Sequence, residues 1–251
     1  MSQPLAGKIA VVTGGSRGIG RAIANKLSSA GCDLAIVYHN SHEEAEQVCV
    51  AARKLGRRAM AIQADVSNPE SVGEAFATFR QEFERLDFAV SNAATGVLRP
   101  AMELTLKHWR RCLETNALAL NLLAQQAVPL MQGGGRIVAL SSLGSVRAIP
   151  HYAFIGASKA ALEALARNLA QELGPQGIRV NVVSAGVVDT DALKFFPNRD
   201  QLLAEYARRT PAGPTLRPED VAGAVYLLCL PEAEMITGHT LTVDGGYCIS
   251  G

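Results

Sequence analysis

The sequence predicts a doubly wound α/β fold built on one seven-stranded parallel sheet. Short runs rich in β-branched residues alternate with longer stretches of helical periodicity along the 251 residues, as expected for strands joined by helical crossovers. Several short runs are apolar at nearly every position, which is typical of parallel strands covered by helices on both faces. The length fits one large domain better than two small ones, so we expect a single domain over 1–251.

Seven apolar runs are the expected strands. They are Ile9–Thr13, Leu34–Tyr38, Ala59–Gln63, Phe88–Ser91, Arg136–Ser141, Arg179–Ser184 and Thr240–Val243. The helical stretches between them are Gly20–Ala30, His42–Leu55, Pro69–Phe83, Leu104–Met131, His151–Leu173 and Pro218–Leu230. Several of these begin after Ser, Thr, Asn or Asp, which are residues that cap helix N-termini.

Residues 187–214 interrupt this alternation. They place 28 residues with three prolines between the sixth strand and the next helix, which is long for a connection inside a compact domain. Insertions at the carboxyl ends of strands often carry function. We therefore expect this segment to form a short substrate lid.

Composition excludes several classes of protein. The formal net charge is +1 with no strongly charged tract, so we expect no nucleic-acid partner. The five cysteines include no C-x-x-C pair, and the histidines lack metal-ligand spacing, so we expect neither disulfides nor a metal. The N-terminus lacks signal-peptide character, and no apolar run approaches the roughly 18 residues that span a bilayer. We expect a cytoplasmic protein without a membrane partner.

A glycine-rich turn follows the first expected strand. Gly14, Gly18 and Gly20 lie in the segment TGGSRGIG at 13–20. Glycine permits positive φ and close approach of backbone to a phosphate, and the helix that follows presents unpaired N–H groups. The segment predicts a phosphate-binding turn formed by Gly14, Ser16, Arg17, Gly18, Ile19 and Gly20. A turn without a ligand is the simpler alternative.

The end of the second strand favours NADPH over NADH. An acidic residue there usually binds the ribose hydroxyl of NAD. Here His39 and Asn40 follow the strand without a carboxylate, and Arg17 supplies a cation in the glycine turn, which suits a phosphate. We expect His39 and Asn40 beside that phosphate, or else as solvated loop residues.

Several spaced motifs together resemble the short-chain dehydrogenase/reductase superfamily over essentially the whole chain. They are the glycine turn, Asp65-Val66, Ser91-Asn92-Ala93-Ala94, Asn116, Ser141-Ser142, Lys159 and the segment 187–190. The resemblance implies a Rossmann fold that binds a nicotinamide cofactor. The further cofactor contacts it implies are Asp65 and Val66 at the adenine, Asn92 and Ala93 at the adenosine ribose, and Val188 and Thr190 at the nicotinamide carboxamide. The terminal segment Gly238–Tyr247 resembles the strand and turn through which the superfamily forms tetramers, which implies a homotetramer.

The chain departs from the superfamily at its tyrosine. Members usually carry Tyr-x-x-x-Lys with a serine 13 residues before the tyrosine, and here Ser142 and Lys159 keep that spacing around Ile155. A tyrosine stands instead at Tyr152, seven residues before Lys159. On a helix this separation returns to within about 20° of the same face. We expect Tyr152 and Lys159 to face one cofactor, with the hydroxyl displaced by nearly one turn.

A displaced hydroxyl suits a conjugated acceptor. When hydride reaches the β-carbon of an enoyl thioester, negative charge develops on the more distant thioester oxygen, where a phenol can stabilise it. Tyr-x6-Lys and the segments Asn92–Pro100, Ser141–Ser145 and Asp189–Lys194 resemble the third, NADPH-dependent (L) class of enoyl-acyl-carrier-protein reductases. This implies reduction of trans-2-enoyl-acyl-carrier protein in fatty-acid elongation.

The same resemblance assigns roles to the residues and names a partner. Tyr152 would donate to the enolate oxygen, Lys159 would hold the nicotinamide ribose and favour the tyrosinate, and Ser142 would polarise the carbonyl or merely cap the next segment. Asn116 is expected to brace the helix around Lys159. The partner implied is an acyl-carrier protein bearing an enoyl thioester, with the candidate contacts Arg99, Arg147 and Lys194.

Two other functions fit the same residues. A 3-oxoacyl-carrier-protein reductase or another carbonyl reductase could use Tyr152 from a rearranged helix start. A non-catalytic NADP-binding sensor would explain why no tyrosine stands at Ile155. Full turnover after Tyr152→Phe would remove the enoyl reductase assignment, whereas NADPH binding with no turnover on any acyl substrate would favour the sensor.

Overall fold

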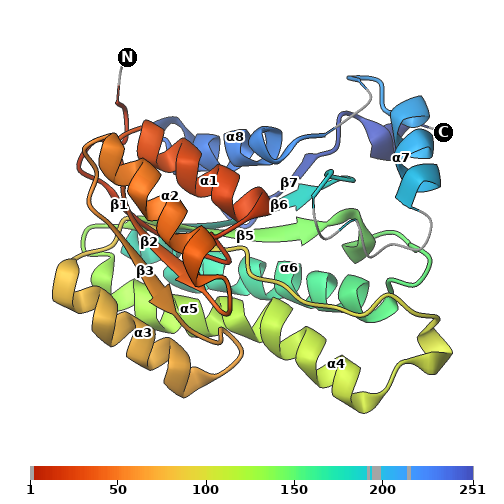
Figure 1. Ribbon diagram of the computed structural model, residues 1–251, viewed down its shortest axis with the longest axis horizontal. Coiled ribbons are helices and arrows are strands. Elements are labelled where there is room, and N and C mark those ends of the chain that lie inside the picture. The colour runs from red at the N-terminus through yellow and green to blue at the C-terminus, as the bar shows by residue number, and fades with distance from the viewer. Residues whose placement is uncertain (1–2, 191–192, 194–198, 214–215, 251) are drawn as a thin grey trace.

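The computed structural model describes residues 3–190, 193, 199–213 and 216–250 (Figure 1). Within them, seven strands form one sheet in the order β3-β2-β1-β4-β5-β6-β7, and every pairing is parallel. The strands are β1 (Ile9–Thr13), β2 (Asp33–Tyr38), β3 (Ala59–Gln63), β4 (Phe88–Ser91), β5 (Gly135–Ser142), β6 (Ile178–Ala185) and β7 (Thr240–Val243). The predicted doubly wound fold is confirmed.

Helices cover both faces of this sheet. They are α1 (Gly18–Ser29), α2 (His42–Lys54), α3 (Pro69–Glu82), α4 (Leu106–Leu113), α5 (Ala119–Ala127), α6 (Ala153–Leu173), α7 (Arg199–Arg209) and α8 (Pro218–Cys229). Figure 1 shows α1, α2 and α8 on one face and α3, α5 and α6 on the other. Within the described residues, none of these helices has the length and apolar character needed to cross a membrane.

Each face of the sheet packs into its own apolar layer. Along β1, Ala10 and Val12 pack with α1, α2 and α8, whereas Ile9 and Val11 pack with α3, α5 and α6. All five residues of β1 are buried, because a strand covered on both faces exposes neither set of its alternating side chains. This explains why the strand sequences are continuously apolar.

The strand order reverses at β1, which pairs with β2 on one side and β4 on the other. In doubly wound sheets this reversal opens a crevice at the carboxyl ends of the strands, where ligands bind. The turns that follow β1 and β4 therefore meet at the expected position of a site.

The stretch Leu104–Met131 was expected to be helical throughout, and the structure corrects this. A π-helical turn, Glu114–Leu118, separates α4 from α5, and a 3₁₀ turn ends the segment at Val128–Leu130. π-turns are rare and often mark functional positions. Here the wider turn contains Asn116, which is buried and hydrogen-bonded.

The helix expected from His151 begins later, at Ala153. His151 has a φ of +62°, which is left-handed and incompatible with a right-handed helix. Tyr152 is the N-cap residue, with φ −113°. The helical projection used for Tyr152 therefore starts one residue outside the helix, and the contacts of its side chain decide what it faces.

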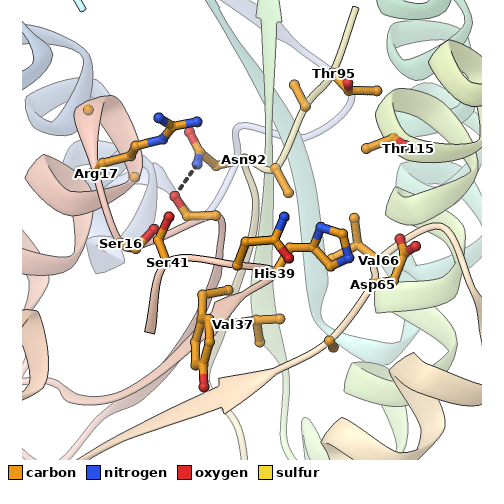
Figure 2. Close-up of a pocket in the computed structure, with 18 of the residues that line it drawn as sticks. Ser16, Arg17, Val37, His39, Ser41, Asp65, Val66, Asn92, Thr95 and Thr115 are labelled. Carbon is orange, nitrogen blue, oxygen red and sulfur yellow. Dashed lines mark hydrogen bonds between the residues drawn. The ribbon is translucent and has the colours of Figure 1, made fainter. Parts of the chain in front are cut away.

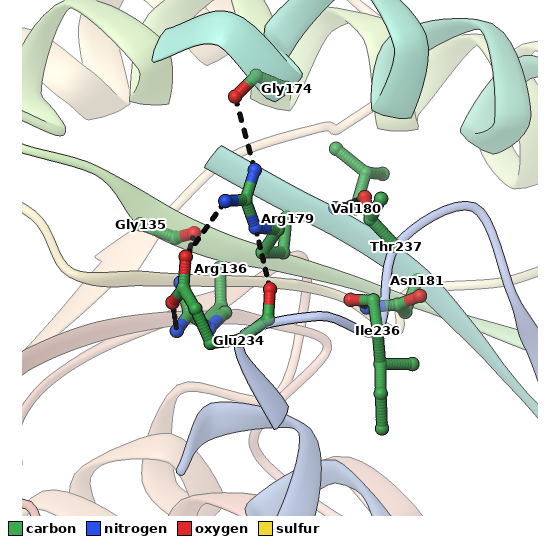
Figure 3. A network of polar contacts seen from close by, with 9 residues as sticks. All are labelled: Gly135, Arg136, Gly174, Arg179, Val180, Asn181, Glu234, Ile236 and Thr237. Carbon is green, nitrogen blue, oxygen red and sulfur yellow. Dashed lines mark hydrogen bonds and ion pairs between the residues drawn. The ribbon is translucent and has the colours of Figure 1, made fainter. Parts of the chain in front are cut away.

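A polar network lies at the amino ends of β5 and β6 (Figure 3). Glu234 accepts from Arg136 at 2.5 Å and from Arg179 at 2.8 Å, at the starts of β5 and β6. Asn181 donates to the Ile236 carbonyl at 2.7 Å and accepts from the His239 amide. These bonds hold the segment before β7 against the amino ends of the strands, far from the crevice.

Part of the expected lid, 187–214, is described. Tyr206 of α7 is buried, donates to the Asp244 carbonyl at 2.6 Å and stacks on Tyr247 at 4.8 Å between ring centroids. Residues 191–192, 194–198 and 214, and with them Lys194, lie outside the described residues. A lid function stays a prediction, as does the extent of the domain.

Asp87 provides a test of how the turn before β4 supports β1. Its buried carboxylate accepts from the Ile9 amide at 3.0 Å and from Lys8 Nζ at 2.9 Å. Asp87→Ala leaves the Ile9 amide without this partner, so we expect the free energy of unfolding to fall by about 1–3 kcal/mol in urea titrations. The exposed neighbour Glu84 provides the control, since Glu84→Ala should change it by less than about 0.5 kcal/mol. Equal stability of the two variants would contradict this account.

Candidate functional site

The glycine turn after β1 is packed too closely for side chains. Gly14 and Gly18 have φ of +63° and +54°, values that favour glycine. A Cβ at Gly20 would lie 2.1 Å from the Gly14 carbonyl oxygen. Arg17, the N-cap residue of α1, makes no side-chain capping hydrogen bond, and the first residues of α1 line the adjoining cavity, as in helix N-termini that bind anions.

Asn92, after β4, holds this turn in place. Its side-chain nitrogen donates to the carbonyls of Thr13 and Gly14, both at 3.0 Å, and Figure 2 shows the side chain above the turn. In return, Thr13 Oγ1 accepts from the amides of Asn92 and Ala93 at 3.0 and 3.2 Å. The side-chain nitrogen of Asn92 thus bonds the protein itself, which the sequence did not reveal.

A cavity of about 780 Å³ opens beside the turn (Figure 2). The expected cofactor residues that line it are Gly14, Ser16, Arg17, Gly18, Ile19, Gly20, His39, Asn40, Asp65, Val66, Asn92, Ala93 and Thr190. Lining residues that the sequence did not indicate include Tyr38, Ser41, Ser67, Thr95, Arg111 and Thr115. The last two lie on α4 and the π-helical turn, and no local pattern marks them.

Charge is distributed unevenly around this cavity. Arg17 and Arg111 are its arginines and Asp65 is its carboxylate. Ser67 donates to Asp65 Oδ1 from its hydroxyl at 2.6 Å and from its amide at 3.0 Å, and this hydrogen bonding holds the pKa of Asp65 below its usual value. The cavity therefore offers a cation, Arg17, at the glycine turn and an anion, Asp65, after β3, with Arg111 of α4 close enough to Asp65 to lower its pKa.

Tyr152 and Ser142 meet at the end of β5. Their hydroxyl oxygens are 3.2 Å apart. Ser142 is the N-cap residue of the 3₁₀ turn Leu143–Ser145, but its side chain makes no capping hydrogen bond. The ring of Tyr152 lies against Gly144, where a Cβ would be 2.6 Å from the ring. Burial raises the pKa of Tyr152, and the hydrogen bond with Ser142 opposes this increase.

Lys159 lies in α6, seven residues after Tyr152. It is buried, and its Nζ donates to the Leu140 carbonyl of β5 at 2.7 Å. Burial lowers the pKa of Lys159 to about 8, and electrostatic interactions with Cys112 and Glu163 oppose this decrease. The contacts with Leu140 and Ser142 therefore bring Lys159 and Tyr152 to the same end of β5.

Ile155 occupies the position where a tyrosine was missing. It is buried, and its side chain fills the space above Gly96, where a Cβ would lie 2.2 Å from Ile155 Cγ1. The loop after β4 thus closes over this position. Ile155 therefore makes an apolar contact with the loop after β4.

Asn116 links the loop after β4 to α6. Its Oδ1 accepts from the Thr95 amide at 2.8 Å, and its Nδ2 donates to the Thr95 carbonyl and to Ser158 Oγ, both at 2.9 Å. It thereby joins the loop after β4 to α6, next to Lys159. The bond to α6 is made to the side-chain hydroxyl of Ser158.

Some expected site residues lie outside the cavity lining. Ser142, Tyr152 and Lys159 border the end of β5, and Val188 is buried and forms an isolated bridge with Leu216. Among the described residues, no group of three or more His, Cys, Asp or Glu side chains could hold a metal ion.

Comparisons with known proteins agree with this architecture. A family model described as Enoyl-(Acyl carrier protein) reductase matches residues 14–248. The 1-cyclohexenylcarbonyl-CoA reductase of Streptomyces collinus is 40% identical, over 96% of this chain and 87% of its own. A hydroxynaphthalene reductase-like protein Arp2 of Metarhizium anisopliae is 35% identical, over 96% of this chain and 95% of its own.

A solved structure matches equally well. The short-chain dehydrogenase of Burkholderia cenocepacia in complex with NADP has a TM-score of 0.91 and 39% identity, covering 98% of this chain and 99% of that chain. The agreement extends over the whole sheet and both helical layers.

The Ser142–Tyr152 contact can be tested without any ligand. Ser142→Ala removes a hydrogen bond that stabilises the tyrosinate, so we expect the pKa of Tyr152 to rise further above its ordinary value. The phenolate absorbance of each protein, after subtraction of its Tyr152→Phe counterpart, reports this titration. Ser145→Ala removes a hydroxyl from the same loop and should leave it unchanged; a lower pKa after Ser142→Ala would be inconsistent with the geometry.

Proposed function

The chain belongs to the short-chain dehydrogenase/reductase superfamily of oxidoreductases, and we propose that it reduces the conjugated double bond of trans-2-enoyl thioesters with NADPH. The observation that carries this proposal is the 3.2 Å contact between Tyr152 and Ser142, combined with the burial of Ile155 against Gly96. The proposed donor pair is therefore Ser142, at its usual spacing, and the displaced Tyr152.

The cavity fits a dinucleotide phosphate. The glycine turn leaves helix N–H groups open beside Arg17, and the end of β2 contributes His39 and Asn40 without a carboxylate, which favours NADPH over NADH. Arg111 adds a second cation to the lining. When bound, NADPH supplies the hydride.

The chain's own residues orient the substrate and stabilise developing charge. Tyr152 donates a hydrogen bond from its hydroxyl to the thioester oxygen as that oxygen gains negative charge, and Ser142 holds the phenol in place. The pKa of Tyr152 is raised by burial, so the phenol keeps its proton at neutral pH and can donate it. Lys159 is positively charged below its pKa of about 8 and favours the anionic form of the phenol after donation.

The name of one relative supports a conjugated thioester. The Streptomyces protein is named for 1-cyclohexenylcarbonyl-CoA, in which the ring double bond is conjugated with the thioester carbonyl. We extend the proposal to an enoyl group on an acyl-carrier protein in fatty-acid elongation. Arg99 and Arg147 are exposed and are the proposed contacts with the carrier's phosphopantetheine, in a cytoplasmic homotetramer.

A carbonyl reductase is the second candidate. Its support is the similarity to a hydroxynaphthalene reductase-like protein, together with a Tyr152–Ser142 pair that could also polarise a ketone. The two reactions require different placement of the oxygen relative to the carbon that accepts hydride. Activity on enoyl thioesters as against 3-oxoacyl thioesters therefore distinguishes the two reactions.

Purified protein with NADPH should oxidise the cofactor when given crotonyl or longer trans-2-enoyl thioesters, on coenzyme A or acyl-carrier protein, and remain inactive with 3-oxoacyl thioesters. Tyr152→Phe should lower kcat about 10²-fold or more, because it removes the donor to the developing oxyanion, while NADPH still binds. Oxidation only with the 3-oxo substrate favours the carbonyl reductase. NADPH binding without turnover on either substrate favours the sensor.

Arg17 is expected to set the cofactor preference. A charge-assisted hydrogen bond to phosphate is worth about 1.5–3 kcal/mol, so Arg17→Ala should raise the Kd for NADPH by about 10–100-fold and change that for NADH much less. Fluorescence titration of both cofactors measures this. Arg21 is an exposed arginine in the first turn of α1, which Arg17 precedes, so Arg21→Ala is the charge-matched control. An equal loss for NADPH and NADH after Arg17→Ala would refute the assignment.

A further inference from the structure

Glu163 is a buried carboxylate that the chemistry above does not use. It is 7% exposed, and its Oε1 accepts a hydrogen bond from Ser141 Oγ at 2.5 Å. Among the described ion pairs, which extend to 4.0 Å between nitrogen and oxygen, none includes Glu163. A carboxylate is seldom buried without a close cationic partner, so the surroundings of Glu163 call for a physical explanation.

Lys159 and Glu163 lie one turn apart on the buried face of α6. Residues four positions apart on a helix are neighbours, and both side chains face consecutive residues of β5. Lys159 donates to the Leu140 carbonyl, and Glu163 accepts from Ser141. A cation and an anion are therefore held in register against one strand, inside the protein, with the cation next to the site.

The other groups around this pair carry no compensating negative charge. Cys112 of α4 faces Lys159, but burial raises the pKa of its thiol, which stays neutral at neutral pH. Asn116 of the π-helical turn and Ser158 are neutral and bond to each other. Tyr152 at the helix start is protonated at neutral pH because burial also raises its pKa, and Arg167, one turn beyond Glu163, is exposed.

We propose that Glu163 is a positioning residue of the active site: its buried negative charge, oriented by Ser141, keeps Lys159 protonated. It acts through Lys159 and contacts neither substrate nor cofactor. Burial lowers the pKa of Lys159 to about 8, and Cys112 and then Glu163 oppose that decrease. Because the raised pKa of Cys112 keeps its thiol neutral at neutral pH, Glu163 is the group whose charge acts on Lys159 there. Without the carboxylate, Lys159 would lose its proton at a lower pH.

The attraction has a defined pH window. It contributes to stability while Lys159 is charged, below its folded pKa of about 8, and fades as pH rises through that value. Glu163→Gln keeps an acceptor for Ser141 and nearly the same volume, so it removes the charge and little else. Its effect on stability should therefore depend on pH, whereas a packing defect would not.

The test compares melting temperatures of wild type and Glu163→Gln at pH 7 and pH 9.5. A coupling of about one pKa unit corresponds to a Tm loss about 3–5 °C larger at pH 7 than at pH 9.5. In a Lys159→Met background this pH-dependent part should vanish. Glu172→Gln, an exposed glutamate of the same helix, is the matched control and should show no such dependence.

A Tm loss of equal size at both pH values, or one that persists in the Lys159→Met background, would overturn the proposal. It would show that Glu163 only packs. Because these measurements need no substrate, their result is independent of whether the chain reduces enoyl thioesters.

A second measurement rests on the proposed function. With an enoyl thioester and NADPH, Glu163→Gln should move the alkaline limb of the kcat profile to lower pH by about one unit, as expected for the loss of one buried charge near a lysine. Glu163→Asp, which keeps the charge, should restore part of this shift. An unmoved limb in an active enzyme contradicts the role of Glu163, whereas absence of enoyl reduction together with the expected Tm pattern contradicts only the proposed function.

Discussion

The contact between α6 and the carboxyl half of β5 is the constraint on which the rest of the site depends. Lys159 donates to the Leu140 carbonyl, Glu163 accepts from Ser141, and Tyr152 meets Ser142. Three consecutive strand residues thus engage two residues of α6 and its N-cap residue. Because the strand is fixed in the middle of a parallel sheet, a shift of α6 would break all three contacts together, which gives the site a single well-defined geometry.

Close backbone approach makes room for the displaced tyrosine. Gly144 leaves space for the ring of Tyr152, and a Cβ at Gly156 would lie 2.5 Å from the Gly144 carbonyl oxygen. Gly96 likewise admits the side chain of Ile155. The same principle operates at the glycine turn, where Gly20 lies against Gly14. Small residues therefore shape both the nucleotide end and the reactive end of the crevice.

The two ends differ in their electrostatics. The cavity next to β1 is lined by polar side chains and two arginines, which suits a negatively charged ligand. The layer around Lys159 is buried, so each charge there shifts the titration of its neighbours. Asn116 joins these two regions, because it bonds both the loop after β4 and Ser158 of α6.

The sequence by itself determined the strands, the parallel sheet, the glycine turn and the departure at Ile155, because each is a local pattern of apolar periodicity, glycine spacing or register within one helix. Only the tertiary structure decided that a π-helical turn holds Asn116, that α6 begins at Ala153, and that Arg111 and Thr115 line the cavity. It also paired Ser141 with Glu163 and Asn116 with Ser158 across 22 and 42 residues. Such pairings arise from the packing of helices on the sheet, which no short stretch of sequence encodes.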